Sequence, residues 1–267
     1  MINPSEIIPG ILFYSYSSTI KKEKVTFMNH TTLVLQVSGH FGMETATERF
    51  SIGAGEMLLI RRNQLGELTK TPLNGEAYQT IIICLYEDLL RQIALEEQIE
   101  IKEKYTGPSN ISISGNDFLH SFFQSVIPYI RHSEEKITNA VGILKVKEAV
   151  LLLLHTMPEL KRFLFDFSEP YKMDLEKFML NNFHFNIPVE KFAQLTGRSL
   201  AGFKRDFRKI FDMSPRHWLQ VKRLTEARYL IEKKNRKPSE IYIELGFENL
   251  SHFSRSFKKQ FGKSPTA

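Results

Sequence analysis

The feature that most constrains the fold is an internal repeat near the C-terminal end. Residues 186–215 align without a gap with residues 236–265, and 11 of the 30 aligned residues are identical. Both copies contain the pattern L-x-x-F-x-R-x-F-x-K-x-F-x-x-S-P. Self-similarity of this kind marks a repeated supersecondary unit, so both copies should fold in the same way.

Each copy is predicted to form a short helix, a turn and a longer helix. The Leu and Phe residues of the pattern recur every three or four positions, which places them on one face of the longer helix. Ser199 and Asn249 stand where a side chain caps the start of that helix. The expected boundaries are 188–211 for the first unit, 215–234 for a connecting helix and 238–261 for the second unit.

The opposite face of each longer helix is polar and basic, and it is the candidate DNA contact. In a helix-turn-helix unit the second helix enters the major groove, where an arginine fork can bond O6 and N7 of guanine. Charged faces are usually only solvated, but the duplication favours DNA here. The predicted contacts are Ala201, Lys204, Arg205 and Arg208, then Ser251, His252, Ser254, Arg255, Lys258 and Lys259. Within and beyond this set, Lys209, Arg216, Lys259 and Lys263 are expected to face phosphates or solvent.

The connecting helix is predicted to set the distance between the two units. Residues 215–234 would span about 28 Å as a helix. With the flanking turns this length approaches the roughly 34 Å of one turn of B-DNA. Both longer helices could then enter successive major grooves on one side of a duplex.

The distribution of charge also indicates an anionic partner. The chain contains 36 Lys and Arg against 30 Asp and Glu. Residues 171–267 contain 20 basic and 10 acidic residues, a net charge of +10, which leaves −4 for the residues before them. A basic last third fits double-stranded DNA as the partner.

The first part of the chain, to about residue 86, is predicted to be a β-sandwich or barrel, because short apolar runs are separated there by glycines that are typical of turns. These glycines are Gly39, Gly42, Gly53, Gly55, Gly66 and Gly75. After that the pattern becomes helical. Expected strands are Ile11–Tyr16, Lys24–Asn29, Thr32–Val37, Glu48–Ile52, Met57–Ile60 and Tyr78–Tyr86. Expected helices are Glu87–Lys104, Phe118–Ile130 and Ile137–Met157, with a loop at Thr106–Asn116. In the last part of the chain we expect seven helices, which are Leu175–Phe183, Val189–Leu195, Leu200–Phe211, Pro215–Lys234, Ser239–Leu245, Leu250–Phe261 and a stub at the end. The expected fold is therefore an α+β chain with domains 1–168 and 172–267.

A family pattern follows the repeat. It comprises Lys222-Arg223-Leu224, Ala227-Arg228-Tyr229-Leu230, Ile241, Leu245-Gly246-Phe247, Phe253, Phe257, Phe261-Gly262 and Ser264-Pro265. With these residues, 172–267 closely resembles the DNA-binding domain of the AraC family of bacterial transcription regulators. The resemblance implies two helix-turn-helix units joined by a long helix and placed in adjacent major grooves near promoters. It also implies base-contacting positions in each unit, which are Ala201, Lys204, Arg205 and Arg208 in the first and Ser251, His252, Ser254 and Arg255 in the second.

The N-terminal part resembles the cupin-type sensor domain common in that family, through Leu33–Ile60 with its turn at Ser38–Gly42. The turn before Glu56 and the following Arg61-Arg62-Asn63 are similar to the branch that includes type III secretion regulators. In that branch a partner protein, rather than a sugar, controls the N-terminal domain. The resemblance implies a regulatory and dimerising domain. Residues expected to line a ligand pocket are Phe13, Phe27 and Leu35.

Catalytic, metal and cofactor sites are not expected. The chain has no P-loop, dinucleotide or nucleophile-elbow motif. A metal cupin needs clustered histidines, and only His30, His40 and Glu44 are candidates, without an H-x-H. The single cysteine, Cys84, ends an apolar run and is expected to be a small buried residue. No signal peptide and no apolar run of about 20 residues is seen, so we expect a cytoplasmic protein away from membranes.

Two hypotheses remain. The first is a sequence-specific transcription regulator that is expected to be an activator acting on the transcription machinery. Its N-terminal domain would respond to a small molecule or a regulatory protein, and the chain would be able to form a homodimer. The second is a cupin-type binding or enzymatic protein whose basic C-terminal domain is only an interaction module. The matched arginines Arg205 and Arg255 favour the first hypothesis.

Overall fold

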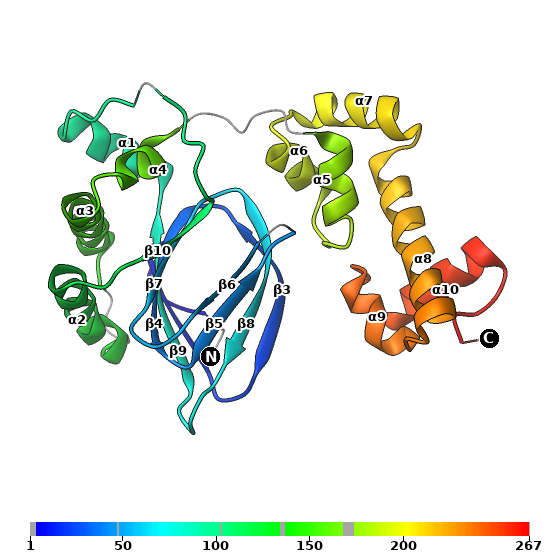
Figure 1. Ribbon diagram of the computed structural model, residues 1–267, viewed down its shortest axis with the longest axis horizontal. Coiled ribbons are helices and arrows are strands. Elements are labelled where there is room, and N and C mark those ends of the chain that lie inside the picture. The colour runs from blue at the N-terminus through cyan, green and yellow to red at the C-terminus, as the bar shows by residue number, and fades with distance from the viewer. Residues whose placement is uncertain (1–3, 47, 102, 134–136, 168–173, 267) are drawn as a thin grey trace. The chain divides into compact units, whose positions relative to one another are not determined.

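The chain divides into two units, residues 1–168 and residues 169–267. The structure is a computed structural model that describes all residues except 1–3, 47, 102, 134–136, 168–173 and 267 (Figure 1). Among the described residues, the first unit contains the β-sheets and four helices, and the second contains helices and no strand. The α+β class and the order of a β-rich domain before a helical one are as predicted.

Two antiparallel sheets form the body of the first unit. The six-stranded sheet has the order β1 (Ser5–Ile8), β2 (Leu12–Ser17), β9 (Tyr78–Leu85), β4 (Thr31–Ser38), β7 (Met57–Ile60), β10 (Asn110–Ile113). The four-stranded sheet has the order β3 (Lys21–Met28), β8 (Gln64–Thr71), β5 (His40–Glu44), β6 (Arg49–Ile52). The register pairs Leu33 of β4 with Leu59 of β7 and with Ile83 of β9.

The central strands of the six-stranded sheet are buried on both faces. Leu33 and Leu59 pack on the side of the sheet that the helices cover. Their chain neighbours Val34 and Leu58 pack on the other side, in the core between the sheets. Successive side chains of a strand point to opposite faces, so both faces need apolar residues. This explains why the sequence of β7 is continuously apolar rather than alternating.

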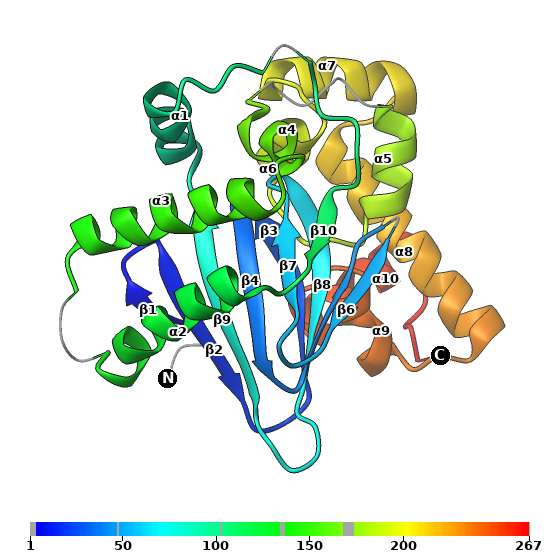
Figure 2. The same cartoon turned by 60° about the vertical axis from the view of Figure 1, so that its left-hand side comes forward.

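Helices cover the outer face of the six-stranded sheet. They are α1 (Glu87–Glu96), α2 (Asp117–Arg131), α3 (Asn139–Thr156) and α4 (Leu160–Phe165). Figure 2 shows α2 and α3 lying across this sheet. Their buried side chains, such as Phe122 and Val146, join the helical-side core. The close approach of α3 needs Gly142, because a Cβ there would come within 2.8 Å of Ile8 and Ile11.

Several expected boundaries in the first unit were wrong. Strands β1, β5, β8 and β10 were not predicted, and β10 lies inside the segment expected to be the loop Thr106–Asn116. Glycines at Gly42 and Gly66 suggested turns, but both lie within strands. The helix expected to reach Lys104 ends at Glu96, followed by Gln98 with a φ of 51°, a left-handed backbone that no helix continues through. Helix α4 was also missed.

The second unit contains six helices within the described residues. They are α5 (Leu175–Asn182), α6 (Val189–Leu195), α7 (Leu200–Phe211), α8 (Pro215–Lys234), α9 (Pro238–Glu244) and α10 (Leu250–Phe261). All six agree with the predicted helices to within a residue at each end. The expected terminal stub is a turn at Pro265 and Thr266 instead.

Candidate nucleic-acid interface

The two copies of the repeat form two helix-turn-helix units, α6 with α7 and α9 with α10. The side chain of Ser199 accepts a hydrogen bond from the backbone N–H of Gly202 at 3.2 Å and caps α7. Asn249 caps α10 in the same way, with the N–H of His252 at 2.8 Å. The predicted caps are therefore confirmed. Each turn contains a glycine with positive φ, Gly197 at 65° and Gly246 at 79°.

The phenylalanines of the repeat hold each longer helix against its own unit. Phe203 and Phe207 of α7 and Phe253 and Phe257 of α10 are almost completely buried. The ring of Phe207 packs edge-on against Trp218 of α8, with 5.5 Å between ring centroids. Burial of one helix face fixes which side chains the other face presents.

The residues predicted to contact DNA lie on the outward face of α7 and α10. Arg205 and Arg255, which match in the repeat, are both exposed. All the other predicted contacts are exposed as well, except Ser254, which is half-buried. Lys263, which was expected to face phosphates or solvent, places its Nζ 2.9 Å from Oε1 of Glu232 on α8. The two longer helices therefore expose faces that carry different polar residues.

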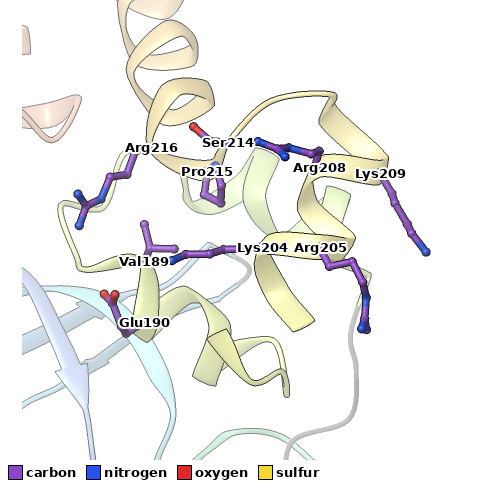
Figure 3. A pocket seen from close by; sticks show the side chains of 9 residues that line it. All are labelled: Val189, Glu190, Lys204, Arg205, Arg208, Lys209, Ser214, Pro215 and Arg216. Atoms are coloured by element: carbon purple, nitrogen blue, oxygen red, sulfur yellow. The ribbon is translucent and has the colours of Figure 1, made fainter. Parts of the chain in front are cut away.

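A basic cleft of about 900 Å³ opens beside α7 (Figure 3). Arg205 and Lys209 extend from α7 away from Arg216, whereas Lys204 extends toward Val189 at the start of α6 (Figure 3). Glu190 is the one carboxylate among the lining side chains. The lining residues are Val189, Glu190, Lys204, Arg205, Arg208, Lys209, Ser214, Pro215 and Arg216. An anionic partner would be attracted to such a cleft.

The turn of the first unit is held by an ion pair that the sequence did not reveal. Nε of Arg198 donates to Oδ2 of Asp206 at 3.2 Å, and its Nη1 donates to the carbonyl oxygen of Thr196 at 2.8 Å. The hydrogen bond from Arg198 lowers the pKa of Asp206 below its ordinary value. The aligned residues of the second unit are Glu248 and Ser256, which cannot form this pair.

The turn of the second unit depends on Arg223 from α8 instead. Nη1 of Arg223 donates to the carbonyl oxygen of Gly246 at 3.1 Å. Its Nε and Nη2 donate to the carbonyl oxygens of Phe183 and Phe185, each at 2.8 Å. Burial lowers the pKa of Arg223 to about 10, so it remains charged at neutral pH. One side chain thus joins the segment after α5, the connecting helix and the second turn.

Comparisons with known proteins identify a family for both the N-terminal and the C-terminal part of the chain. A family model described as a helix-turn-helix domain matches residues 192–267, and one described as the ExsA N-terminal regulatory domain matches residues 31–163. The chain belongs to the AraC family of transcription regulators. The matched regulatory domain also places it in the branch that contains type III secretion regulators, as the resemblance implied.

Relatives of this AraC-family chain are similar over most of their length. The virulence regulon transcriptional activator VirF of Yersinia enterocolitica is 22% identical, over 91% of this chain and 90% of its own. The transcriptional regulator ExsA of Pseudomonas aeruginosa is 23% identical, over 86% and 82%. The crystal structure of an apo ToxT variant from Vibrio cholerae aligns with a TM-score of 0.48 at 12% identity, covering 97% of each chain. The prediction of a DNA-binding regulator rather than an enzyme is confirmed by the family.

The regulatory domain of this AraC-family protein contains a partly open cavity of about 300 Å³ between its two sheets. Phe13, predicted to line a ligand pocket, does line it. Leu35 does not, because it packs against the core on the helical side of β4. Phe27 belongs to β3, but its side chain lies outside the described residues.

Polar groups interrupt the apolar wall of this cavity. Nζ of Lys70, a residue that is 3% exposed, lies 2.6 Å from Oε1 of Glu23, and both residues line the cavity. Cys84 also lines it and is half-buried rather than fully buried. Burial raises the pKa of the Cys84 thiol to about 11, which keeps it protonated and unreactive at neutral pH.

The candidate metal ligands do not gather in one place. His30 stacks against the ring of Tyr86, with 4.1 Å between centroids, and its pKa is lowered by burial. Among the described residues, no three potential ligands are close enough to hold an ion. A membrane-spanning helix is likewise absent from the part of the chain that the structure describes, since none is both long and apolar enough.

Proposed function

We propose that the chain is a transcription activator that binds double-stranded DNA with α7 and α10 in successive major grooves. The observation that carries this proposal is the matched pair of exposed arginines, Arg205 and Arg255, at equivalent positions of two helix-turn-helix units. The relatives named as transcriptional activators support the direction of regulation. Acting on promoters requires contact with the transcription machinery, and in a bacterium the place of action is the cytoplasm.

The connecting helix supports simultaneous binding by the two units. The 20 residues of helix α8 are separated by 19 steps of 1.5 Å, so the helix spans about 28 Å, somewhat less than the roughly 34 Å repeat of B-DNA. Trp218 near the start of α8 packs against Phe207 of the first helix-turn-helix unit, and Ala227 further along α8 lies in the buried core of the second, so α8 is packed against both. A rigid spacer of this length favours two contacts on one side of the duplex.

The basic side chains divide into two roles. Arg205 and Arg255 are assigned to guanine edges, with Ala201, Lys204, Arg208, Ser251, His252 and Ser254 around them. Lys209, Arg216, Lys258 and Lys259 are assigned to phosphates, where a point charge suffices. Phosphate contacts position the protein, and base contacts specify the sequence.

Alanine substitution separates these roles. Arg205→Ala and Arg255→Ala should each cost about 1–3 kcal/mol and relax the preference at one base pair. Arg216→Ala should weaken binding to every sequence and make it less dependent on salt. Lys233→Ala, which removes an exposed charge from the last turn of α8, is the matched control. A uniform loss of affinity for Arg205→Ala and Arg255→Ala would contradict the base-contact assignment.

We further infer that the N-terminal regulatory domain controls the C-terminal DNA-binding domain in response to an effector. The cavity between the sheets would accept a small, mainly apolar molecule, with Phe13 in its wall. A regulatory protein or a second copy of the chain would instead use an outer surface, such as the exposed Ile143 and Leu144 of α3.

Native mass spectrometry of the full chain, purified from its own host, distinguishes these effectors. An added mass of a few hundred daltons supports a small ligand, whereas an added polypeptide supports control by a protein. A doubled mass supports a homodimer. The bare monomer under all conditions, including with DNA, would contradict control by a bound effector.

A further inference from the structure

Asp206 lies on α7 beside the candidate base-contacting residue Arg205, and its carboxylate contacts two arginines. Its Oδ2 accepts a hydrogen bond from Nε of Arg198 at 3.2 Å, and its Oδ1 lies 3.4 Å from Nε of Arg205. The side chain of Arg198 is 10% exposed and that of Arg205 is 67% exposed. The carboxylate therefore joins a buried arginine of the turn to an exposed arginine of the candidate interface.

The position of this carboxylate is fixed from the buried side. Arg198 also donates to the carbonyl oxygen of Thr196 at 2.8 Å, so its guanidinium is held by the turn itself. The pKa of Asp206 is lowered by the hydrogen bond from Arg198, which keeps the carboxylate charged at neutral pH. A charged acceptor in a fixed place orients a flexible donor near it.

Orientation by Nε leaves the outer edge of Arg205 available. The guanidinium has five N–H donors in a fixed fork, and only Nε faces Asp206 in this arrangement. The two terminal nitrogens are the donors that match O6 and N7 of guanine. An arginine oriented before binding loses less rotamer freedom on binding. The negative charge beside it also weakens its attraction to phosphates, so base contact is favoured over backbone contact.

The second helix-turn-helix unit has no equivalent of the Arg198–Asp206–Arg205 arrangement. The residues that align with Arg198 and Asp206 are Glu248 and Ser256, and Ser256 is buried. Nε of Arg255 donates instead to the carbonyl oxygen of Ser251 within α10, at 3.3 Å. Arg255 therefore has no adjacent carboxylate that is held by the turn, although it occupies the same position of the repeat as Arg205.

We propose that Asp206 is a positioning residue that orients Arg205, so that the first helix-turn-helix unit discriminates its base pair more strictly than the second. The proposal rests on the proposed function, because it requires α7 to contact base edges. It concerns a residue that does not itself touch DNA.

The test measures base discrimination by the full chain. A duplex is first selected by the wild-type chain from a random-sequence pool, and every single base-pair substitution of that duplex is then compared in binding. In Asp206→Asn, discrimination should fall by about fivefold or more at the base pair where Arg205→Ala acts. Affinity for an unrelated duplex should stay equal or rise, because a negative charge beside the proposed DNA contact Arg205 is lost. Asp206→Glu, which keeps the charge, should restore part of the discrimination.

A merely structural role of Asp206 predicts a different pattern. Arg198→Gln breaks the same ion pair from the buried side and leaves the carboxylate beside Arg205. If Asp206 only stabilises the turn, both variants should weaken binding to all duplexes equally. We expect discrimination to fall more in Asp206→Asn than in Arg198→Gln, and equal behaviour would overturn the proposal.

A double-mutant cycle guards against effects of Asp206 on folding. In the Arg205→Ala background, Asp206→Asn should produce no further change in discrimination, because the residue it orients is gone. A further change there, or a change at a different base pair, would mean that Asp206 acts without Arg205 and would overturn the proposal. If Arg205→Ala itself changes no base preference, the proposed base contact fails, and that failure is separate from the role of Asp206.

Discussion

In the first helix-turn-helix unit the turn is held by an arginine of its own, Arg198, whereas in the second it is held by Arg223, which comes from α8. Both turns contain a glycine with positive φ, and both units have the same buried phenylalanines. The two copies therefore share the same buried apolar residues and turn glycines but differ in the polar contacts that hold their turns. The first turn is stabilised locally, and the second depends on residues distant in sequence.

Gly246 illustrates this dependence. A Cβ at this position would come within 2.6 Å of the carbonyl oxygen of His184 and within 2.9 Å of Cζ of Arg223. The second turn is thus packed directly against the segment after α5 and against α8. Loss of the connecting helix would therefore disturb the second unit more than the first. Three substitution pairs test how far the two units are equivalent.

The largest expected effect tests the shared skeleton. Phe203→Ala and Phe253→Ala each remove a fully buried ring at the same position of the repeat, and each should cost about 3–5 kcal/mol of stability. Hydrogen exchange of peptides covering α7 and α10 measures the loss in each unit separately. Leu250→Ala, at a position that is 39% exposed, serves as the control with a smaller loss. A loss in one unit more than twice that in the other would show that the cores are not equivalent.

The second pair tests the difference between the turns. Arg223→Met removes the N–H donors that bond three backbone carbonyl oxygens. It should lower the free energy of unfolding by about 2–4 kcal/mol, because buried acceptors lose their partners. Arg198→Met should cost about 1–2 kcal/mol, since Asp206 is partly exposed and can bind water instead. Arg223→Lys should recover only part of the loss, because an ammonium cannot reproduce the planar fork.

Hydrogen exchange again separates the two turns. In Arg223→Met, exchange should accelerate in the segment from Phe183 to Phe185 and around Gly246, while the turn that contains Arg198 stays protected. In Arg198→Met, the pattern should reverse. Acceleration of both turns in both variants would contradict the view that they are held independently.

The repeat explains why most of the C-terminal helical domain was predictable from the sequence. Its helices were placed to within a residue because their periodicity, caps and glycines are all local signals. The contacts of Arg223 were not predictable, because its acceptors Phe183 and Gly246 lie 40 and 23 residues away in the chain. The Arg198–Asp206 pair is closer in sequence, but nothing in the spacing distinguishes it from two solvated charges.

The N-terminal domain was harder to predict than the C-terminal domain, for a physical reason visible in β4. This strand is buried on both faces, so its sequence does not alternate between apolar and polar residues. The direction of Leu35 was therefore undetermined, and the expectation that it lines the cavity was wrong. Glycine gave the opposite error in β5 and β8, where Gly42 and Gly66 pair in the four-stranded sheet rather than form turns.

The smallest expected effect tests the helix caps, where the two units differ only in chemistry. Ser199→Ala and Asn249→Ala should each cost about 1 kcal/mol, because each leaves a backbone N–H at the start of a longer helix without its side-chain acceptor. The bond made by Asn249 is shorter, 2.8 Å against 3.2 Å, so its loss should be slightly the larger. Ser199→Asp and Asn249→Asp keep an acceptor and should retain most of the stability. Exchange of the first-turn amides of α7 and α10 measures both losses, and unchanged exchange in the alanine variants would mean that water replaces these caps without cost. In that case the two units would be equivalent at their caps, and their difference would lie in the turns alone.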